Sequence, residues 1–279
     1  MNRILFESHE ILDGVATFGG ERAEHVMNVL HGEVGQTLKT GEINGLIGTS
    51  VITDITRLPS QVSSPSITVS CSHTEKSLSP WIDLILAPPR PRVMKRLLPQ
   101  LAALGVGRLF LVGAKKVEKD FWGATLLKSE NYRPLLVDGL MQAGTSILPT
   151  LETRRNFRKF VKEEVGEIWP TATRIVAHPY GAGEDLRRET EDLRGRETED
   201  GRRGLTSFVS RPVGLTSFVS RPSPSVVLAV GPEGGWTDDE VALLEEHGFA
   251  RYSLGSRILR TDTATIALLA QLMKEFGQC

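Results

Sequence analysis

The sequence predicts an α/β protein in two parts, a small N-terminal β-barrel and a larger domain built on a parallel sheet. Residues 1–75 consist of short apolar segments separated by glycines, which is typical of a small barrel. From residue 80 to residue 279, strand-like apolar segments alternate with amphipathic helices, which indicates a parallel sheet covered by helices. A chain of 279 residues is long enough for one large domain or two modest ones.

The composition is that of an ordinary globular protein. Hydrophobic residues make up 40% and charged residues 24% of the chain, which excludes collagen-like, coiled-coil and wholly disordered proteins. The two cysteines, Cys71 and Cys279, cannot form a disulfide framework, and no CxxC pair offers a metal site. No apolar run reaches the roughly 18 residues of a membrane span, and the start is charged too early for a secretory signal. We therefore expect a cytoplasmic protein without a metal or a membrane partner.

The first part is expected to hold one helix among its strands. Apolar side chains recur at helical spacing after residue 20, and glycines then punctuate the segments that follow. In chain order we expect a helix at 21–30, strands at 36–39, 46–52 and 67–70, an exposed turn at 58–66, and a linker at 77–80.

The second part is expected to alternate strands and helices. Pro99 lies within the first predicted helix and should kink it or break it locally. The expected strands are 81–87, 108–112, 174–178, 226–230 and 252–254, and the expected helices are 93–104, 132–141, 238–247 and 263–276.

A duplicated segment interrupts the second part. Gly204–Pro212 recurs without change as Gly214–Pro222. Two copies are too few for a solenoid, so we expect a disordered, solvent-exposed insertion over about 184–222 that contributes no chemistry.

Charge is distributed unevenly along the chain. Residues 1–75 hold 4 Lys and Arg against 9 Asp and Glu, whereas residues 76–183 hold 17 against 9. A polyanion responds to a local field more than to net charge, so the basic segment is a candidate nucleic-acid face. A well-solvated helical surface would explain the same pattern.

One candidate binding loop follows the strand that ends at Val230. The run Gly231-Pro232-Glu233-Gly234-Gly235 leads into a helix whose start is fixed by a capping box of Thr237 and Glu240. Glycines at the carboxyl end of a parallel strand let the backbone approach a ligand closely. A plain tight turn is the alternative for this loop, and Trp236 beside it is either a core anchor or a stacking surface for a base.

A second candidate loop precedes the last helix. It reads Leu254-Gly255-Ser256-Arg257-Ile258-Leu259-Arg260-Thr261-Asp262-Thr263-Ala264. Apolar Ile258 and Leu259 between charged residues suggest a loop folded over an apolar ligand. Arg257 or Arg260 could meet an anionic group, and Asp262 near a helix N-terminus would stay ionised.

Together these two motifs resemble the bacterial small-subunit 16S rRNA (uracil-N3)-methyltransferases, which belong to the SPOUT superfamily. Arg22-x-x-His25 and Gly41-Glu42-x-Asn44-Gly45 resemble the PUA-like barrel of that family, and Arg90-Pro91-Arg92-Val93 resembles a proteobacterial branch of it. The resemblance implies a PUA-like RNA-binding domain at 1–75 and a SPOUT methyltransferase domain at 80–279 with a trefoil knot. It also implies S-adenosylmethionine as cofactor, 16S rRNA in the small ribosomal subunit as substrate, and a homodimer.

The resemblance also implies roles for particular residues. Methylation at N3 of uracil requires loss of a proton, so Arg260 is expected to orient the uracil or a phosphate, and Asp262 or Glu233 to accept the proton. The alternative is that Arg260 and Asp262 pair with each other or cap the last helix. The expected cofactor contacts are His178, Gly231, Pro232, Gly234, Leu254, Gly255, Ile258, Leu259 and Thr261. The expected RNA contacts are Arg22, His25, Arg90 and Arg92, with Arg154 and Arg155 from a basic-aromatic cluster that includes Phe157 and Phe160.

The sequence departs from the family at two places. Met141–Thr145 lacks the Glu and Arg of the Glu-Gln-Ala-Arg run that is common in the branch, and Asp262 stands where Glu is usual. A SPOUT ribose 2′-O-methyltransferase and a non-catalytic RNA-binding assembly factor are the competing hypotheses. The N-terminal barrel and the second loop argue against the first, and the missing Glu and Arg give some weight to the second.

Overall fold

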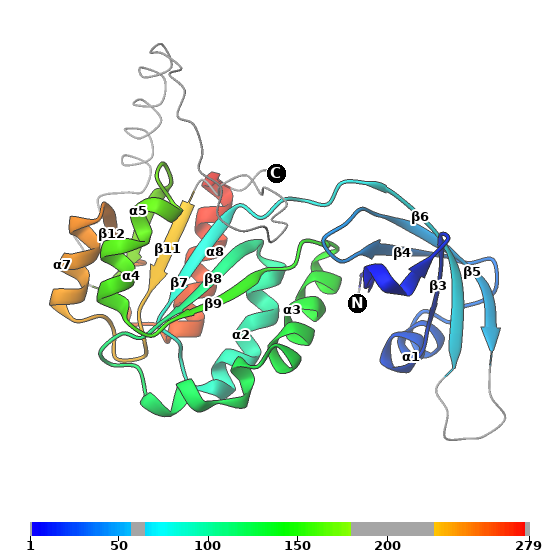
Figure 1. The fold of residues 1–279 in the computed structure, drawn as a ribbon, viewed down its shortest axis with the longest axis horizontal. Helices are drawn as coiled ribbons and strands as arrows, with labels where there is room; N and C mark the ends of the chain where they lie inside the picture. Colours follow the sequence, from blue (N-terminus) through cyan, green and yellow to red (C-terminus); the bar gives the residue numbers. More distant parts are fainter. Residues whose placement is uncertain (1, 57–64, 180–225, 277–279) are drawn as a thin grey trace, which may run out of the picture.

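The computed structural model of the chain describes residues 2–56, 65–179 and 226–276. These residues form two six-stranded sheets, one in each half of an elongated molecule (Figure 1). The insertion expected at about 184–222 lies outside the described residues, as does most of the turn expected at 58–66.

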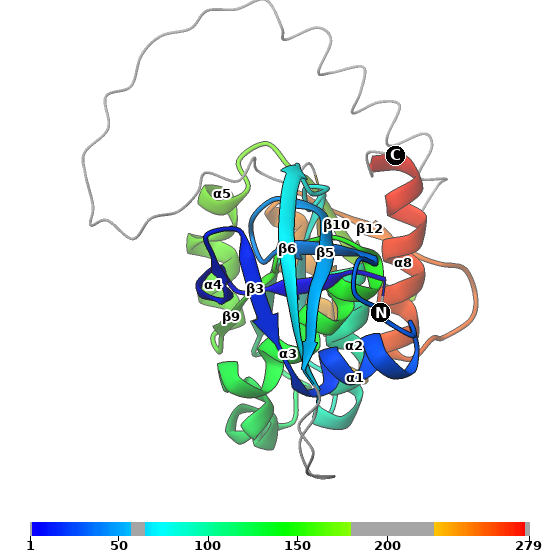
Figure 2. The ribbon, with the colours of Figure 1, turned by 90° about the vertical axis from the view of Figure 1, so that its right-hand side faces the viewer.

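The N-terminal half is a curled, mixed sheet, which confirms the barrel-like part. Its strand order is β1-β4-β5-β6-β3-β2, and only the β1–β4 pair is parallel. The long strands β5 and β6 stand beside β3 in Figure 2, with α1 across their lower end. The elements are β1 (Ile4–Phe6), η1 (Ser8–Glu10), β2 (Ile11–Leu12), β3 (Val15–Phe18), α1 (Gly20–Asn28), β4 (Thr37–Glu42), β5 (Ile47–Thr56) and β6 (Ser66–Glu75).

The core of this half arises from the period of two along its strands. Exposed and buried residues alternate through β3 and the first part of β5, so one face of each strand is removed from water. The helix α1 covers that face with Ala23 and Val26, which are fully buried against Phe6 and Phe18.

The C-terminal half is a parallel sheet, as the sequence predicts. Its strand order is β12-β10-β11-β7-β8-β9, and every neighbouring pair is parallel. Its strands are β7 (Ile82–Leu86), β8 (Val106–Val112), β9 (Thr150–Arg154), β10 (Thr173–Ala177), β11 (Val226–Val230) and β12 (Phe249–Tyr252). Its helices are α2 (Pro91–Ala103), η2 (Lys119–Gly123), η3 (Thr125–Leu127), α3 (Ser129–Ala143), α4 (Phe157–Glu163), α5 (Val165–Ile168), α7 (Asp238–Glu246) and α8 (Thr261–Phe276).

Both faces of this sheet are covered by helices. Leu84 and Leu86 of β7 belong to a core shared with α2, α3 and α8, whereas Ile85 belongs to a core shared with α4, α5 and α7. Figure 1 shows the two helical layers on opposite sides of the strands. Every residue of β7 and β11 is buried, and both central strands are apolar throughout except for Asp83 of β7.

The sequence-based expectations do not include β1, β2 and β3 in the first half, β9, α4 and α5 in the second, or the short 3-10 helices η1, η2 and η3. The strand β9 is a short, half-exposed edge strand with two charged residues, and α4 has only seven residues, so neither shows a clear period. Of the two expected effects of Pro99, a kink or a local break, the break is wrong, because α2 runs through Pro99 without interruption. Gly139 of α3 allows the close approach there, since a Cβ at that position would lie 2.0 Å from the Pro99 carbonyl oxygen.

Hydrogen bonds join the two halves beyond the connecting segment. The Arg3 guanidinium donates to the carbonyl of Gly144 (2.9 Å), just after α3. Ser146 is fully buried, accepts from the Asn44 amide at its carbonyl (2.8 Å), and donates from Oγ to the Gly45 carbonyl (2.8 Å). These contacts hold the turn between β4 and β5 against the end of α3.

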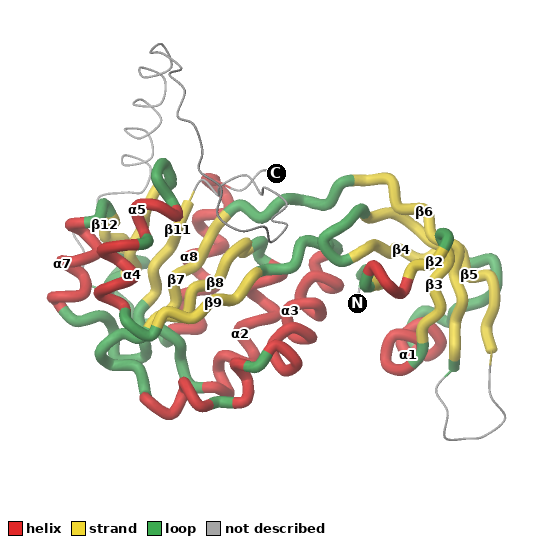
Figure 3. Tube along the Cα trace, viewed as in Figure 1, coloured by secondary structure: helices red, strands yellow, loops and turns green. Residues whose placement is uncertain are grey.

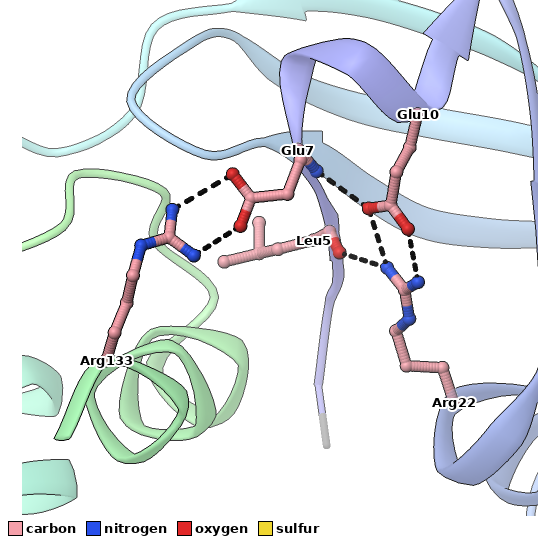
Figure 4. A network of polar contacts seen from close by, with 5 residues as sticks. All are labelled: Leu5, Glu7, Glu10, Arg22 and Arg133. Carbon is pink, nitrogen blue, oxygen red and sulfur yellow. Dashed lines mark hydrogen bonds and ion pairs between the residues drawn. The ribbon is translucent and has the colours of Figure 1, made fainter. Parts of the chain in front are cut away.

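Two arginine–glutamate pairs line a cavity at this joint (Figure 4). Arg133 of α3 binds both carboxylate oxygens of Glu7, and Arg22 of α1 binds both oxygens of Glu10. The cavity between the pairs measures about 480 Å³ and has an apolar floor that includes Leu5. The Glu7–Arg133 pair therefore links the N-terminal sheet to the helical layer of the C-terminal half.

A buried carboxylate anchors the amino end of the parallel sheet. Asp83 of β7 is 1% exposed and accepts from the Arg108 amide (2.8 Å), the Arg108 guanidinium (2.5 Å) and the Trp169 indole (2.7 Å). It thereby ties together two strands and the segment after α5.

We predict that Asp83→Ala lowers the free energy of unfolding by about 3 kcal/mol, because it leaves the buried Trp169 N–H and a partly buried guanidinium without a partner. The matched control is Glu245→Ala. It breaks the bidentate Glu245–Arg251 ion pair, which lies at an exposed position. That change should cost less than about 1 kcal/mol. Urea unfolding followed by circular dichroism measures both, and equal effects would contradict the prediction.

Candidate functional site

The candidate site lies at the carboxyl end of the parallel sheet. After β7 the chain turns into α2 on one face, whereas after the neighbouring strand β11 it turns into α7 on the other face. Such a divergence of adjacent strands opens a crevice, the usual ligand position in open α/β sheets. Loops gather at this end of the sheet in Figure 3. A small cavity of about 40 Å³ lies there between Pro88–Arg90, Lys116–Glu118 and Pro232–Glu233.

The first glycine loop is a tight, well-packed turn. The Gly235 amide donates to the Pro232 carbonyl (2.8 Å), and Gly235 has a φ of +70°, which favours glycine. Gly231 is covered by Trp236, since a Cβ at Gly231 would lie 3.0 Å from the Trp236 nitrogen and 3.1 Å from its ring. Gly234 makes room for the stem of Lys116, whose Cδ would lie 3.0 Å from an added Cβ.

Trp236 is a core anchor and not a stacking surface. Its side chain is 5% exposed and lies parallel to the ring of Phe157 of α4, with 5.0 Å between ring centroids. The alternative that Trp236 stacks on a base is therefore wrong. The tryptophan instead fixes the loop to the core beneath α4.

The capping box predicted at the start of α7 is confirmed, and it also binds a second loop. Glu240 is 5% exposed and accepts from the amide (2.9 Å) and the hydroxyl (3.1 Å) of Thr237. Its other oxygen accepts from the Lys115 amide (2.7 Å) in the loop after β8. Next to it, Lys116 donates from Nζ to the Gly234 carbonyl (2.7 Å). The loop after β8 is thereby fastened to the first glycine loop.

The second glycine loop runs from Ser253 to Arg260 and is much more open. Gly255 has a φ of +109°, and a Cβ built there would meet nothing within 4 Å. Ile258 is 74% exposed and Leu259 is 38% exposed. Exposed apolar side chains beside an open backbone form a surface that a ligand or a partner chain can cover.

The two loops meet at the start of α8. Thr261 is 6% exposed, and its hydroxyl donates to the Gly231 carbonyl (3.5 Å). On the other side, the amide of His178, which follows β10, donates to the Tyr252 carbonyl (2.9 Å). The structure therefore brings the residues expected to bind the cofactor to the ends of three neighbouring strands.

The three catalytic candidates lie around the same end but do not contact one another. Asp262 pairs with Arg96 of α2 (3.6 Å), so the alternative that it pairs with Arg260 is wrong. Glu233 is 3.9 Å from the Arg90 guanidinium. The Arg260 side chain is exposed and makes no ion pair within the described part of the chain.

Two of the expected RNA contacts have internal partners instead. Arg22 is half-buried over the rings of Phe6 and Phe18 and is bound by Glu10 (2.5 Å). Arg154 is held by Glu164 (2.6 Å) and Glu152 (2.9 Å). Hydrogen bonding to Glu164 is the main reason why the pKa of Arg154 is raised. Carboxylates bind both guanidinium groups in this structure, so an RNA contact of Arg22 or Arg154 stays a prediction and would require RNA to compete with these pairs.

The other expected RNA contacts differ in exposure. His25 is half-buried, and its Nε2 is buried without a hydrogen-bond partner, which favours a packing role. Arg90, Arg92 and Arg155 are exposed near the carboxyl end of the sheet, and Arg90 also pairs with Glu118 (3.1 Å). Phe157 and Phe160, expected to belong to the basic cluster, are buried in the core under α4.

Sequence reasoning missed the residues whose partners lie far away in the chain. The local part of the Glu240 cap follows from its spacing to Thr237, but its bond to Lys115 spans 125 positions. The contacts of Lys116 and Arg96 leave no local signal either. In the described residues there is no helix long and apolar enough to cross a membrane, and no group of three potential metal ligands.

Comparison with known proteins supplies a family. Residues 76–273 match the family described as RNA methyltransferase domain. A protein of Treponema pallidum named Ribosomal RNA small subunit methyltransferase E is 27% identical over 98% of this chain and 91% of its own length. A Borreliella burgdorferi protein named Ribosomal RNA small subunit methyltransferase E 1 is 24% identical over 96% of this chain and 95% of its own length.

Solved structures share the fold. A crystal structure of a Neisseria gonorrhoeae Ribosomal RNA small subunit methyltransferase E bound to S-adenosyl methionine superposes with a TM-score of 0.65 at 20% identity, covering 99% of this chain and 98% of that one. A Legionella pneumophila putative methyltransferase in complex with its cofactor SAM gives a TM-score of 0.66 at 22% identity, covering 98% and 97%.

We predict that Glu240→Ala loosens both fastened loops. Loss of the cap and of the acceptor for Lys115 should lower the free energy of unfolding by about 2 kcal/mol. Hydrogen exchange at the amides of Lys115 and Thr237 should accelerate. Asp239→Ala removes the neighbouring carboxylate, which is 76% exposed, and should change the free energy of unfolding by less than about 0.5 kcal/mol. Unchanged exchange at Lys115 in the Glu240 variant would refute the prediction.

Proposed function

The chain belongs to the RNA methyltransferase domain family, and we propose that it transfers the methyl group of S-adenosylmethionine to N3 of a uridine in 16S rRNA of the small ribosomal subunit. The names of the two bacterial relatives support a substrate in the small subunit. The observation that carries the proposal is the contact between the two glycine loops, in which Thr261 reaches the Gly231 carbonyl beside the crevice of the parallel sheet.

The loops have properties that suit S-adenosylmethionine. The exposed side chains of Ile258 and Leu259 offer apolar cover for an adenosine, and the open backbone at Gly255 offers polar groups to its edge. We propose that the expected cofactor contacts hold S-adenosylmethionine mostly through backbone groups. Among them, Gly231 and Pro232 are buried and Gly234 faces Lys116. When bound, the cofactor supplies an electrophilic methyl group.

The chemistry requires a proton acceptor and an oriented base. The N3–H of uracil is a weak acid, so a carboxylate near the methyl group would take its proton as the bond from N3 to carbon forms. The carbon–sulfur bond would break at the same time and leave the sulfur as a neutral thioether. Asp262 and Glu233 are the two candidates, and each lies within 4 Å of an arginine, Arg96 for Asp262 (3.6 Å) and Arg90 for Glu233 (3.9 Å). Arg260 is free to orient the uracil or a neighbouring phosphate.

The RNA is proposed to approach the carboxyl end of the sheet. Arg90, Arg92 and Arg155 are exposed there, in the basic stretch between residues 76 and 183. We propose that residues 1–75 act as a PUA-like RNA-binding domain and that residues 80–279 form the SPOUT methyltransferase domain with its knot. An enzyme with this substrate would work in the cytoplasm.

We further propose that the protein acts as a homodimer. Met273 on α8 is 39% exposed, and Ile258 is exposed on the loop that leads into the same helix, so apolar surface is available near the site. Sedimentation velocity at micromolar concentration should give twice the mass of one chain. A monomer that binds cofactor and methylates RNA would refute this part alone.

The activity is tested directly with small subunits that lack the modification. Purified protein and cofactor labelled in the methyl group are incubated with them, and the RNA is digested to nucleosides. We expect the label in N3-methyluridine. Label in a 2′-O-methylated nucleoside would favour a ribose methyltransferase, and absence of both label and cofactor binding would favour a non-catalytic assembly factor.

We predict that Arg260→Ala reduces turnover at least 100-fold while the Kd for S-adenosylmethionine changes less than about 2-fold, because the side chain is proposed to act on the RNA. Single-turnover methyl transfer and calorimetry measure the two quantities. Arg251→Ala removes an arginine that is paired with Glu245 outside the site, and it serves as the control. Unchanged turnover in the Arg260 variant would remove Arg260 from the mechanism.

A further inference from the structure

An exposed arginine lies against a partly exposed tryptophan beside the candidate site. Trp122 belongs to η2, and Arg155 follows the last residue of β9. The guanidinium carbon of Arg155 is 5.7 Å from the centre of the Trp122 ring, and Nη2 donates to the Trp122 carbonyl (3.4 Å). The two residues are 33 positions apart, and the aromatic partner of Arg155 is Trp122 and neither Phe157 nor Phe160 of the basic-aromatic cluster seen in the sequence.

Trp122 differs from the other tryptophans of the chain. Trp169 and Trp236 are 0% and 5% exposed, and Trp81 uses its indole N–H to bind the Leu104 carbonyl (2.8 Å). Trp122 is half-buried and packs edge-on against the ring of Phe121, with 5.5 Å between centroids and an angle of 87°. Phe121 is 2% exposed, so one side of Trp122 packs against the core of the C-terminal half.

The pair lies next to the crevice. Phe121, the neighbour of Trp122, lines the small cavity that also touches Arg90 and Glu233. Trp122 follows β8 and Arg155 follows β9. Both strands are parallel to β11, so they end at the same carboxyl end of the sheet. An RNA strand that presents a base to the glycine loops would pass this edge.

Arg155 also contrasts with the preceding arginine. Arg154 has two carboxylate partners, whereas Arg155 is exposed and forms no ion pair within the described residues. Only the ring and one carbonyl oxygen position its guanidinium, so most of its donors stay free. A planar cation held on an indole is a ready surface for a nucleobase, because bases stack on guanidinium planes and aromatic rings.

We propose that Trp122 and Arg155 form a stacking platform for an unpaired base of the substrate RNA that flanks the methylated nucleotide. This inference rests on the proposed function, since it assigns part of the RNA to that site. Stacking tolerates any base, because every base has a π-face. The platform therefore contributes affinity and positioning, while the choice of nucleotide is made elsewhere.

The test separates stacking from charge. Trp122→Ala should raise KM for the small subunit about 10-fold and leave kcat within about 2-fold, and Trp122→Phe should recover most of the loss. Arg155→Lys keeps the charge but loses the planar group, so it should weaken RNA binding without changing the salt dependence of the Kd. Arg158→Ala is the matched control, because it removes an exposed arginine that pairs with Asp239 (3.5 Å) and is no part of the platform, so KM should stay within about 2-fold of wild type.

Cofactor affinity and binding of the small subunit, measured without turnover, keep this inference distinct from the proposed function. If the wild-type chain binds the subunit but methylates nothing, the proposed function fails while the platform is still measured by binding. If wild type methylates N3 and both Trp122→Ala and Arg155→Lys match it in KM, the platform is refuted. Should Trp122→Ala bind no cofactor because it misfolds, Trp122→Phe and Arg155→Lys decide the question, and wild-type behaviour of Arg155→Lys overturns the proposal.

Discussion

The structure depends on one constraint, that two adjacent parallel strands send the chain to opposite faces of the sheet. β7 leads to α2 and β11 leads to α7, and each strand is buried along its whole length. Because the carboxyl ends of these strands cannot be closed by a single connection, a crevice remains between their loops. The rest of the candidate site is built around that crevice, with Thr261 bridging to Gly231 and Glu240 fastening the loop after β8.

The glycines of the first loop are needed for the packing of the loop itself as well as for the approach of a ligand. Gly231 accommodates Trp236 and Gly234 accommodates Lys116, so the packing of this loop against its neighbours already requires both glycines. The second loop is the opposite case, with an open Gly255 and two exposed apolar side chains. With one packed loop and one open loop, a ligand can enter and then be covered by the second loop. Only the second loop then loses conformational entropy on binding.

The fold could be predicted further than the site. Central strands such as β11 and the capped start of α7 carry strong local signals, whereas β9 and α4 are too short and too polar on one side to show a period. The glycine loops could be located because glycine, proline and capping residues act locally. The partners of Arg154, Asp262 and Trp122 could not, because each contact depends on how distant segments are brought together. Arg154 and Arg155 form one basic cluster in the sequence, but they have different surroundings in the structure. Arg154 is paired with Glu152 and Glu164, whereas Arg155 is exposed and lies on Trp122.

The central claim is that the two glycine loops together bind S-adenosylmethionine. Hydrogen exchange of the whole chain with and without the cofactor tests it most directly. We expect the cofactor to slow amide exchange in both the 231–237 and the 253–261 segments. Exchange around the Glu7–Arg133 cavity at the joint should change little. Protection confined to that cavity, or to one loop alone, would contradict it.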